Sequence, residues 1–311
     1  MSNFRFRSDL ALDFKELEDA DGKLHFKTSQ RRQVRIETLV LEKERFGKKP
    51  GTYTSLAFEG LALETLREDL AEVLAEELET MIDALAIRDL NRILVCGLGN
   101  PDLSCDAIGP LLADELLVSA HIPEEDRQQE RMRAVALLIP RVRAQTGMET
   151  IELLLGTIER FQPDLVIAVD ALASRSLGRV GHVIQLTDAG MQPGSGVGNH
   201  TRELTRSSLG VPLICIGIPT VVDVSTVAYD VLEMVENHFA KHLEDEWNET
   251  LSAHLLGEFG RLEEADGRQL LREILTPAGM NMIVMDKSID LEVKELASIV
   301  SRALNQVLLA Y

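Results

Sequence analysis

Short apolar runs alternate with segments of helical periodicity through the middle of the chain. The runs cover residues 93–96, 134–139, 165–169, 180–186 and 211–216. Between the second and third runs, Ile151, Leu154, Leu155 and Ile158 follow the spacing of one helix face. Continuous apolar strands separated by helices are typical of a mostly parallel sheet that is covered on both faces. We therefore predict an α/β protein, with a sheet between helix layers and a core at about 90–240.

The flanking residues are expected to form additions to this core. Residues 34–41 and 53–58 read as a hairpin or edge strands around a turn at 47–51, and a long amphipathic helix is predicted over 63–85. Helices are also predicted over 223–238, 268–276 and 288–309, while the charged residues 243–269 read as an exposed excursion. We expect one domain over 10–311 with N- and C-terminal decorations.

Composition restricts the possible partners. With 51 acidic and 32 basic residues the net charge is −19, and such a surface repels a phosphate backbone, so direct nucleic-acid binding is not expected. The apolar stretches are too short to span a membrane, and residues 1–9 do not form an apolar signal region. We expect a cytoplasmic protein without a membrane partner. Cys96 and Cys215 lie in apolar runs and are expected to be buried, whereas Cys105 is expected to be partly exposed.

Two aspartates follow apolar runs and are the main candidates for chemistry. Asp106 comes after the run at 93–96 and its glycine-containing loop, and Asp170 ends the run at 165–169. Ligands of parallel sheets bind outside the carboxyl ends of the strands, where two carboxylates could share a proton and activate a water molecule. Each aspartate also has a structural interpretation. Asp106 could cap the following helix, and Asp170 could pair with Arg175.

Glycine-rich loops supply the other candidates for a substrate cleft. Gly97-Leu98-Gly99 begins like a dinucleotide loop, but Asp102 stands where the third glycine belongs. The stretch 190–200 holds four glycines in nine residues, which permits close backbone approach to a ligand. His200 reads as a solvated loop histidine rather than a substrate-orienting group. The cleft candidates are Gly97, Gly99, Asn100, Asp188, Gly194, Gly196, Gly198, Asn199 and His200.

Taken together, these segments resemble the germination protease (spore protease) family. The matching stretches include 97–100 with 106–110, and 145–150 with 170–176, and they continue with 193–199 and 217–223. Weaker matches lie at 7–11 and 47–51. Against the family pattern, Arg141 and Arg143 stand where small or apolar residues are usual, and His200 stands where lysine is common. The surface that faces the substrate is therefore expected to differ from that of other family members.

The resemblance implies an endopeptidase that degrades small acid-soluble spore proteins during germination, with Asp106 and Asp170 as the catalytic carboxylates. It also implies a phosphorylase/hydrolase-like three-layer sandwich related to hydrogenase maturation endopeptidases, a homotetramer and a location in the forespore or spore core. No metal or other cofactor is expected. The family is made as a self-processing zymogen, and its cleavage pattern matches Ser8-Asp9-Leu10-Ala11, which predicts a propeptide over 1–9 and scission between Asp9 and Leu10.

Two other functions are compatible with the same residues. A metal-dependent peptidase of the hydrogenase-maturation type would hold its ion with Asp106, Asp170 and a histidine such as His200. A non-catalytic binding protein would use the aspartates only as helix caps. Inhibition by a chelator would distinguish the metal-dependent peptidase from an acid–base peptidase. Incubation with a purified spore protein would distinguish a binding protein from either peptidase.

Overall fold

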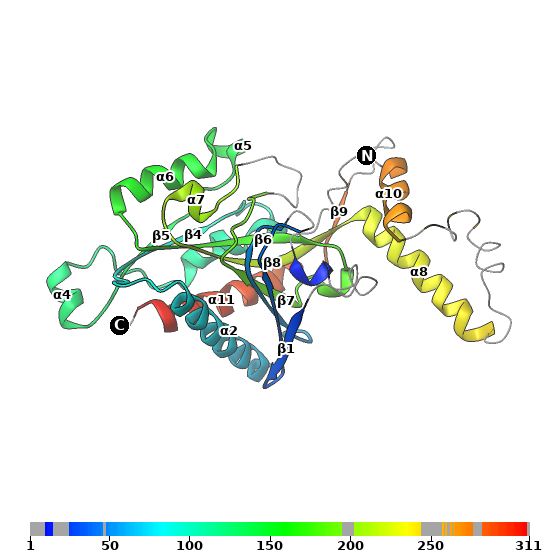
Figure 1. Cartoon of the computed structure of the whole chain (residues 1–311), viewed down its shortest axis with the longest axis horizontal. Helices are drawn as coiled ribbons and strands as arrows, with labels where there is room; N and C mark the ends of the chain where they lie inside the picture. The colour runs from blue at the N-terminus through cyan, green and yellow to red at the C-terminus, as the bar shows by residue number, and fades with distance from the viewer. Residues whose placement is uncertain are drawn as a thin grey trace.

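The computed structural model describes residues 10–14, 25–45, 48–194, 202–243, 257, 259, 262, 264–275 and 282–309. Within these residues a nine-stranded sheet runs through the molecule, and helices lie on both of its faces (Figure 1). The strands are β1 (Phe26–Arg31), β2 (Val34–Leu41), β3 (Gly51–Ala57), β4 (Arg92–Gly97), β5 (Ala134–Leu138), β6 (Leu165–Ser174), β7 (Val183–Thr187), β8 (Leu213–Asp223) and β9 (Ile283–Val284).

The sheet has a parallel part and an antiparallel part. Strands β8, β6, β4 and β5 lie side by side and are parallel. From β8 the sheet continues with β7, β3, β2 and β1, all antiparallel, and β9 also pairs antiparallel with β8. The predicted α/β class is confirmed, and the sheet is mixed. Residues 26–57, which we expected to decorate the core, add three strands to its sheet.

The helices form a layer on each face of the sheet. α2 packs against α11 on one face, while α6 and α7 contact each other on the other (Figure 1). The α-helices are α2 (Glu64–Ala84), α3 (Ile108–Leu111), α4 (Glu124–Gln129), α5 (Arg143–Thr146), α6 (Thr150–Phe161), α7 (Arg206–Leu209), α8 (Val224–Leu243), α10 (Glu264–Leu275) and α11 (Ile289–Leu308). Short 3-10 turns are η1 (Ala11–Phe14), η2 (Ser104–Asp106), η3 (Leu112–Asp114) and η4 (Leu177–Arg179).

Strand β6 separates two apolar cores. Leu165, Ile167 and Val169 face the larger core, which α2 and α11 cover. Val166 and Ala168 face the smaller core, to which α6 contributes Ile151 and Leu154. Because side chains alternate along a strand, Asp170 continues the second face.

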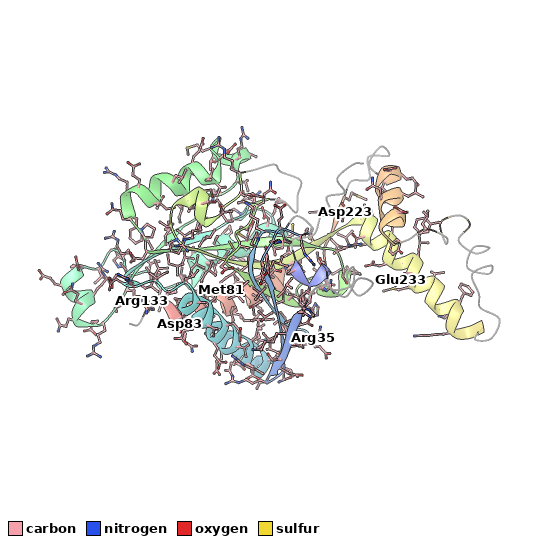
Figure 2. All side chains as sticks on the ribbon, viewed as in Figure 1. Arg35, Met81, Asp83, Arg133, Asp223 and Glu233 are labelled. Carbon is pink, nitrogen blue, oxygen red and sulfur yellow. The ribbon has the colours of Figure 1, made fainter. Side chains whose placement is uncertain are left out.

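Helix α2 confirms the helix predicted over 63–85. Its buried side recurs at Leu66, Leu70, Leu74 and Leu78, at the spacing of one helix face. Figure 2 shows Met81 and Asp83 on this helix, of which Met81 is buried in the larger core and Asp83 is exposed. The apolar stripe therefore determines how the helix lies on the sheet.

Strands β6 and β8 are longer than their apolar runs predicted. The prediction that this strand ends at Val169, with Asp170 just beyond it, is wrong, because β6 continues to Ser174. The extension of β6 pairs with the extension of β8 as far as Val222, with an irregularity at Leu172/Ala173. β4 ends at Gly97, whose partner is Val169. Asp170 is thus the first residue of β6 beyond the end of β4.

Helices α8 and α10 pack together and extend beyond the sheet (Figure 1). Asp223, the last residue of β8 (Figure 2), accepts hydrogen bonds from the Ser225 backbone N–H over 2.9 Å and from the Ser225 hydroxyl over 2.5 Å. Most of the excursion predicted at 243–269 lies outside the described residues, and α10 begins within it. In the described part of the chain, a helix long and apolar enough to cross a membrane is not found.

Candidate active site

The turn after β4 is built on glycines that allow close backbone contacts. Leu98 donates its backbone N–H to the Val169 carbonyl over 2.8 Å, which holds the turn against β6. Gly99 has φ +117°, and a Cβ there would overlap the Asp106 carbonyl oxygen. A Cβ on Gly97 would overlap the Gly109 backbone in the same way. These two glycines therefore serve backbone packing around Asp106.

Asp106 is held by the turn and is partly buried. Its carboxylate Oδ2 accepts the Asn100 backbone N–H over 2.9 Å, and its carbonyl oxygen accepts the same N–H over 2.9 Å. Burial raises the pKa of Asp106 to about 6, although the bond from Asn100 opposes the shift. The helix-cap interpretation is not supported, because α3 begins after Ala107 without a side-chain cap. A carboxyl group with this pKa can gain or lose a proton near neutral pH.

Asp170 is the more deeply buried of the two candidates. It is 3% exposed, and its Oδ1 accepts the Ala171 backbone N–H over 2.9 Å. Burial, and then the nearby charge of Asp170, raises the pKa of the Cys96 and Cys215 thiols. Because both cysteines belong to the smaller core, Asp170 lies at the edge of that core, just past the end of β4.

One turn connects the two aspartates. Leu98 is hydrogen-bonded to Val169, the residue before Asp170. Asn100, two residues after Leu98 in the same turn, is hydrogen-bonded to Asp106. The loop that carries Asp106 is also tied to β8, because the Thr220 hydroxyl donates to the Cys105 carbonyl over 2.6 Å. Both aspartates therefore flank the segment Leu98–Asn100 at the carboxyl end of β4.

Gln145 is a further site residue that our sequence-based list of cleft residues lacked. Its Nε2 donates to Asn100 Oδ1 over 2.9 Å and to Asp102 Oδ2 over 2.7 Å. Gln145 lies on α5, which follows β5, so it joins a second strand end to the turn. Its place at the start of the motif 145–150 was the signal that could have identified it.

Asp188 lies where β7 meets β3, away from the turn after β4. Its Oδ1 accepts the Thr52 backbone N–H over 2.7 Å, which connects the end of β7 to the start of β3. Burial, and then the charge of Asp188, raises the pKa of Tyr53. The described contacts of Asp188 are thus those of a residue that fixes β3, although its charge also reaches Cys215.

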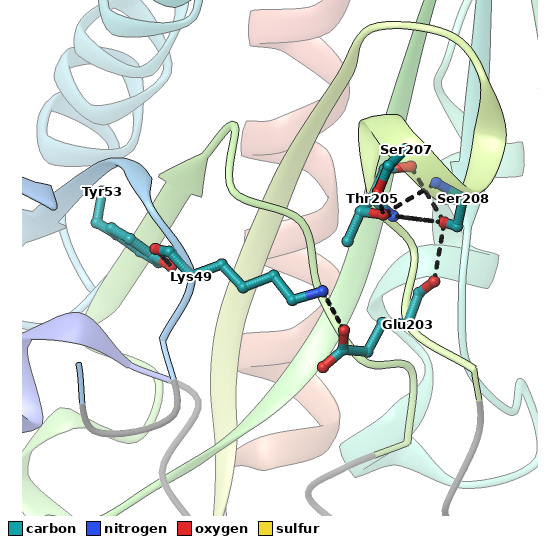
Figure 3. A network of polar contacts seen from close by, with 6 residues as sticks. All are labelled: Lys49, Tyr53, Glu203, Thr205, Ser207 and Ser208. Atoms are coloured by element: carbon teal, nitrogen blue, oxygen red, sulfur yellow. Dashed lines mark hydrogen bonds and ion pairs between the residues drawn. The ribbon is translucent and has the colours of Figure 1, made fainter. Parts of the chain in front are cut away.

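The glycine-rich stretch is described only at its base. Gly194 has φ +69° and is half-buried, while Gly196, Gly198, Asn199 and His200 lie outside the described residues. Met191 and Leu204 close the base through two backbone hydrogen bonds of 2.9 and 2.8 Å. Figure 3 shows Glu203 in an ion pair with Lys49, and Thr205 capping α7 through Ser208. These contacts fix where the stretch leaves and rejoins the fold.

The residues after the predicted cleavage point are buried beside β6. Asp9 lies outside the described residues, whereas Leu10 is fully buried and packs with Leu172 and Val183. Asp13 is also buried, accepts the Arg175 backbone N–H over 2.9 Å and pairs with Arg179. This bond is made by the Arg175 backbone, so the pairing of the Arg175 side chain with Asp170 stays a prediction. Leu10 thus packs against β6 at Leu172, two residues after Asp170.

The three cysteines are buried in the structure. The expectation that Cys105 would be partly exposed is wrong, since it is 7% exposed and packs against Ala173 and Val221. Burial, followed by the charge of Asp106, raises the pKa of the Cys105 thiol. A raised thiol pKa disfavours the thiolate that a cysteine nucleophile requires. Among the described residues, a group of three or more side chains that could hold a metal ion is not found.

Comparison with known proteins identifies relatives along almost the whole chain. The family model described as germination protease matches residues 9–252 and 244–310. A germination protease of Bacillus pumilus (strain SAFR-032) is 35% identical over 350 residues, covering 99% of this chain and 94% of that protein. One of Halalkalibacterium halodurans is 36% identical over 309 residues, covering 88% and 82%.

A similarity was also found among solved structures. A crystal structure of a [NiFe] hydrogenase maturation protease from Thermococcus kodakarensis KOD1 is 26% identical and covers 46% of this chain and 80% of its own, with a TM-score of 0.30.

The family-model match and the curated relatives, on an α/β fold, define a peptidase. More particularly, the chain belongs to the germination protease family. The resemblance stated from its motifs is thereby confirmed.

Proposed function

We propose that this protein is an endopeptidase that degrades small acid-soluble spore proteins during germination, with Asp106 and Asp170 as its catalytic pair. The observation that carries the proposal is that Asp106 and Asp170 lie on either side of the turn Leu98–Asn100, with the pKa of Asp106 raised to about 6. Two aspartates in one site can divide the roles of acid and base.

In the proposed mechanism the ionised aspartate takes a proton from a water molecule as the water attacks the peptide carbonyl. The protonated aspartate donates to the carbonyl oxygen and later assists the leaving amine. Asp106 can change its protonation state near neutral pH, because burial raises its pKa to about 6. The pair titrates as a unit when its members interact strongly.

We further propose that the chain is made as a zymogen that removes residues 1–9 by cutting between Asp9 and Leu10. The burial of Leu10 against Leu172 supports this, since it fixes the segment next to the strand that carries Asp170. The proposal also includes a homotetramer and a location in the cytoplasm of the forespore or spore core, as the family resemblance implies. N-terminal sequencing of the mature protein tests the cleavage point, and light scattering tests the tetramer.

The activity is tested by incubating purified protein with a purified small acid-soluble spore protein and identifying the products by mass spectrometry. We expect discrete internal cleavage that is lost in Asp106→Asn and in Asp170→Asn. Asp164→Asn is the matched control. Asp164 precedes the same strand β6 and also accepts backbone N–H groups, from Asn91 and Arg92, but at the opposite edge of the sheet.

Three outcomes of that experiment would contradict the proposal. Full activity in either active-site variant would remove that aspartate from the mechanism. Activity abolished by a chelator and restored by a metal would indicate the metal-dependent alternative. A spore protein that is bound but never cut would indicate a binding protein.

A further inference from the structure

Three arginines with exposed side chains lie on two segments that are linked to the turn beside the catalytic candidates. They are Arg141 and Arg143, which follow β5, and Arg202, which follows the glycine-rich stretch. The Arg143 side chain is 66% exposed and that of Arg202 is 73% exposed. The chain as a whole has a net charge of −19, so positive charge at this place runs against its general composition. We call these three residues the arginine rim.

The segment that bears Arg141 and Arg143 is anchored on the aspartate turn at both ends. Ile139, just before it, lies against Gly97. Gln145, just after it, donates to Asn100 and Asp102, and Asn100 is itself bonded to Asp106. The two guanidinium groups are therefore carried by a segment that is fixed relative to Asp106.

Arg202 is connected to the same segment through Glu149. The Arg143 Nη1 lies 3.5 Å from one Glu149 oxygen, and the Arg202 Nε lies 3.8 Å from the other. Both distances exceed the roughly 2.7–2.9 Å of a strong charge-assisted hydrogen bond. Glu149 also belongs to the capping box of α6. One carboxylate thus faces two arginines without using their donors fully, and the guanidinium groups retain N–H donors for another carboxylate.

We propose that the arginine rim binds an acidic stretch of the substrate polypeptide beside the bond that is cut. Arginine suits this role because its planar guanidinium group can bind a carboxylate through two parallel hydrogen bonds. The rim would hold a carboxylate-rich segment while the neighbouring residues of the same polypeptide reach the aspartate turn. This inference rests on the proposed peptidase function, although its binding step can be measured without any cleavage.

The first test measures binding of fluorescein-labelled octaglutamate and octaglutamine by fluorescence anisotropy. The variants are the triple Arg141→Gln/Arg143→Gln/Arg202→Gln, the triple with lysine at the same positions, and Arg131→Gln as control. Arg131 is a close match for Arg141. Both are exposed and have positive φ, 53° and 58°, but Arg131 precedes β5 at the other edge of the sheet.

We expect the wild type to prefer octaglutamate, and the glutamine triple to bind it about 10-fold more weakly, since exposed charge pairs each contribute modestly to binding. The lysine triple should retain part of the binding, and Arg131→Gln should retain all of it. The preference should weaken as salt is raised, because exposed charges are screened. Equal binding of the two peptides by the wild type would overturn the proposal, and so would an equal loss in Arg131→Gln.

The second test measures cleavage of a purified small acid-soluble spore protein. We expect the glutamine triple to raise KM about 10-fold with kcat unchanged, because the rim contributes binding and does not touch the reacting atoms. A fall in kcat at unchanged KM would contradict this role. If the wild type cut no spore protein, the proposed function would fail, while the anisotropy measurement would still decide whether the rim binds acidic peptide.

Discussion

The backbone N–H of Asn100 lies 2.9 Å from the carboxylate of Asp106, and the residue two places earlier in the same turn is bonded to the strand that carries Asp170. This short turn joins two residues that stand 64 positions apart in the chain, since 170 minus 106 is 64. The turn requires glycine, it holds an aspartate with a raised pKa, and a segment near the N-terminus is buried beside the same strand. Each of these features can be tested by a measurement.

Replacing Asp106 should change how stability depends on pH. The pKa of Asp106 is raised from 3.8 to about 6 in the folded protein, so the folded state binds this proton more tightly than the unfolded state does. Its ionisation therefore costs stability as pH rises from about 4 to about 6, and the full cost is present above that range. The free energy of unfolding of Asp106→Asn, relative to that of the wild type, should therefore rise by about 2 kcal/mol between pH 4.5 and pH 7.5. Urea unfolding at the two pH values measures this gain, and a gain that falls as pH rises would refute the raised pKa.

Adding a methyl group at Gly99 should damage both the fold and the activity. The substitution Gly99→Ala puts a side chain at φ +117° and into the Asp106 carbonyl oxygen, so we expect a loss of about 2–4 kcal/mol. Gly147→Ala is the control. Gly147 also has positive φ, +74°, but nothing lies within 4 Å of its added methyl group, and about 1 kcal/mol should be lost. Thermal unfolding of the two variants compares these costs, and equal losses would show that the contact with Asp106 has no importance.

Asp13 should be essential to the buried segment near the N-terminus. Asp13→Asn removes the buried charge that pairs with Arg179 and weakens the bond from the Arg175 backbone, so we expect a loss of about 3–5 kcal/mol. Arg31→Gln removes the pairs that the half-exposed Arg31 makes with Glu76 and Glu77, and should cost about 1 kcal/mol. Both losses are read from urea unfolding at pH 7. A small effect of Asp13→Asn would mean that the segment is held by its apolar contacts alone.

The thiols should be unreactive in the folded protein. Cys96, Cys105 and Cys215 are buried, and burial raises the pKa of each thiol, so the nucleophilic thiolate is scarce at neutral pH. Iodoacetamide at pH 7.5 should label these cysteines only after denaturation and should leave peptidase activity intact. Mass spectrometry of tryptic peptides locates any label. Rapid native labelling of Cys105 accompanied by loss of activity would instead point to a cysteine mechanism.

The parallel core was predictable because its strands are continuous apolar runs. β4 and β5 lie within one residue of the predicted 93–96 and 134–139, since burial on both faces requires apolar side chains throughout. The ends of β6 and β8 were not predictable in this way. Residues 171–174 form a strand because β8 extends beside them, and this pairing cannot be predicted from the sequence of either segment alone.

The candidate site was predictable to a similar degree. Asp106 and Asp170 stand out because each carboxylate follows an apolar run, but their shared turn depends on contacts between distant residues. The anchoring by Gln145 and the burial of Leu10 likewise arise from pairings across the sheet edge. The raised pKa of Asp106 depends on packing around the carboxyl group, which local sequence does not specify.

Cleavage rates of a purified spore protein by Asp106→Asn, Asp170→Asn and the double variant test most directly whether the two aspartates act together. Residues that act as one unit are strongly non-additive, so each single variant should lose nearly as much activity as the double. Circular dichroism confirms that each variant is folded. Losses that multiply independently, or a single variant that cleaves at the wild-type rate, would contradict a shared catalytic role.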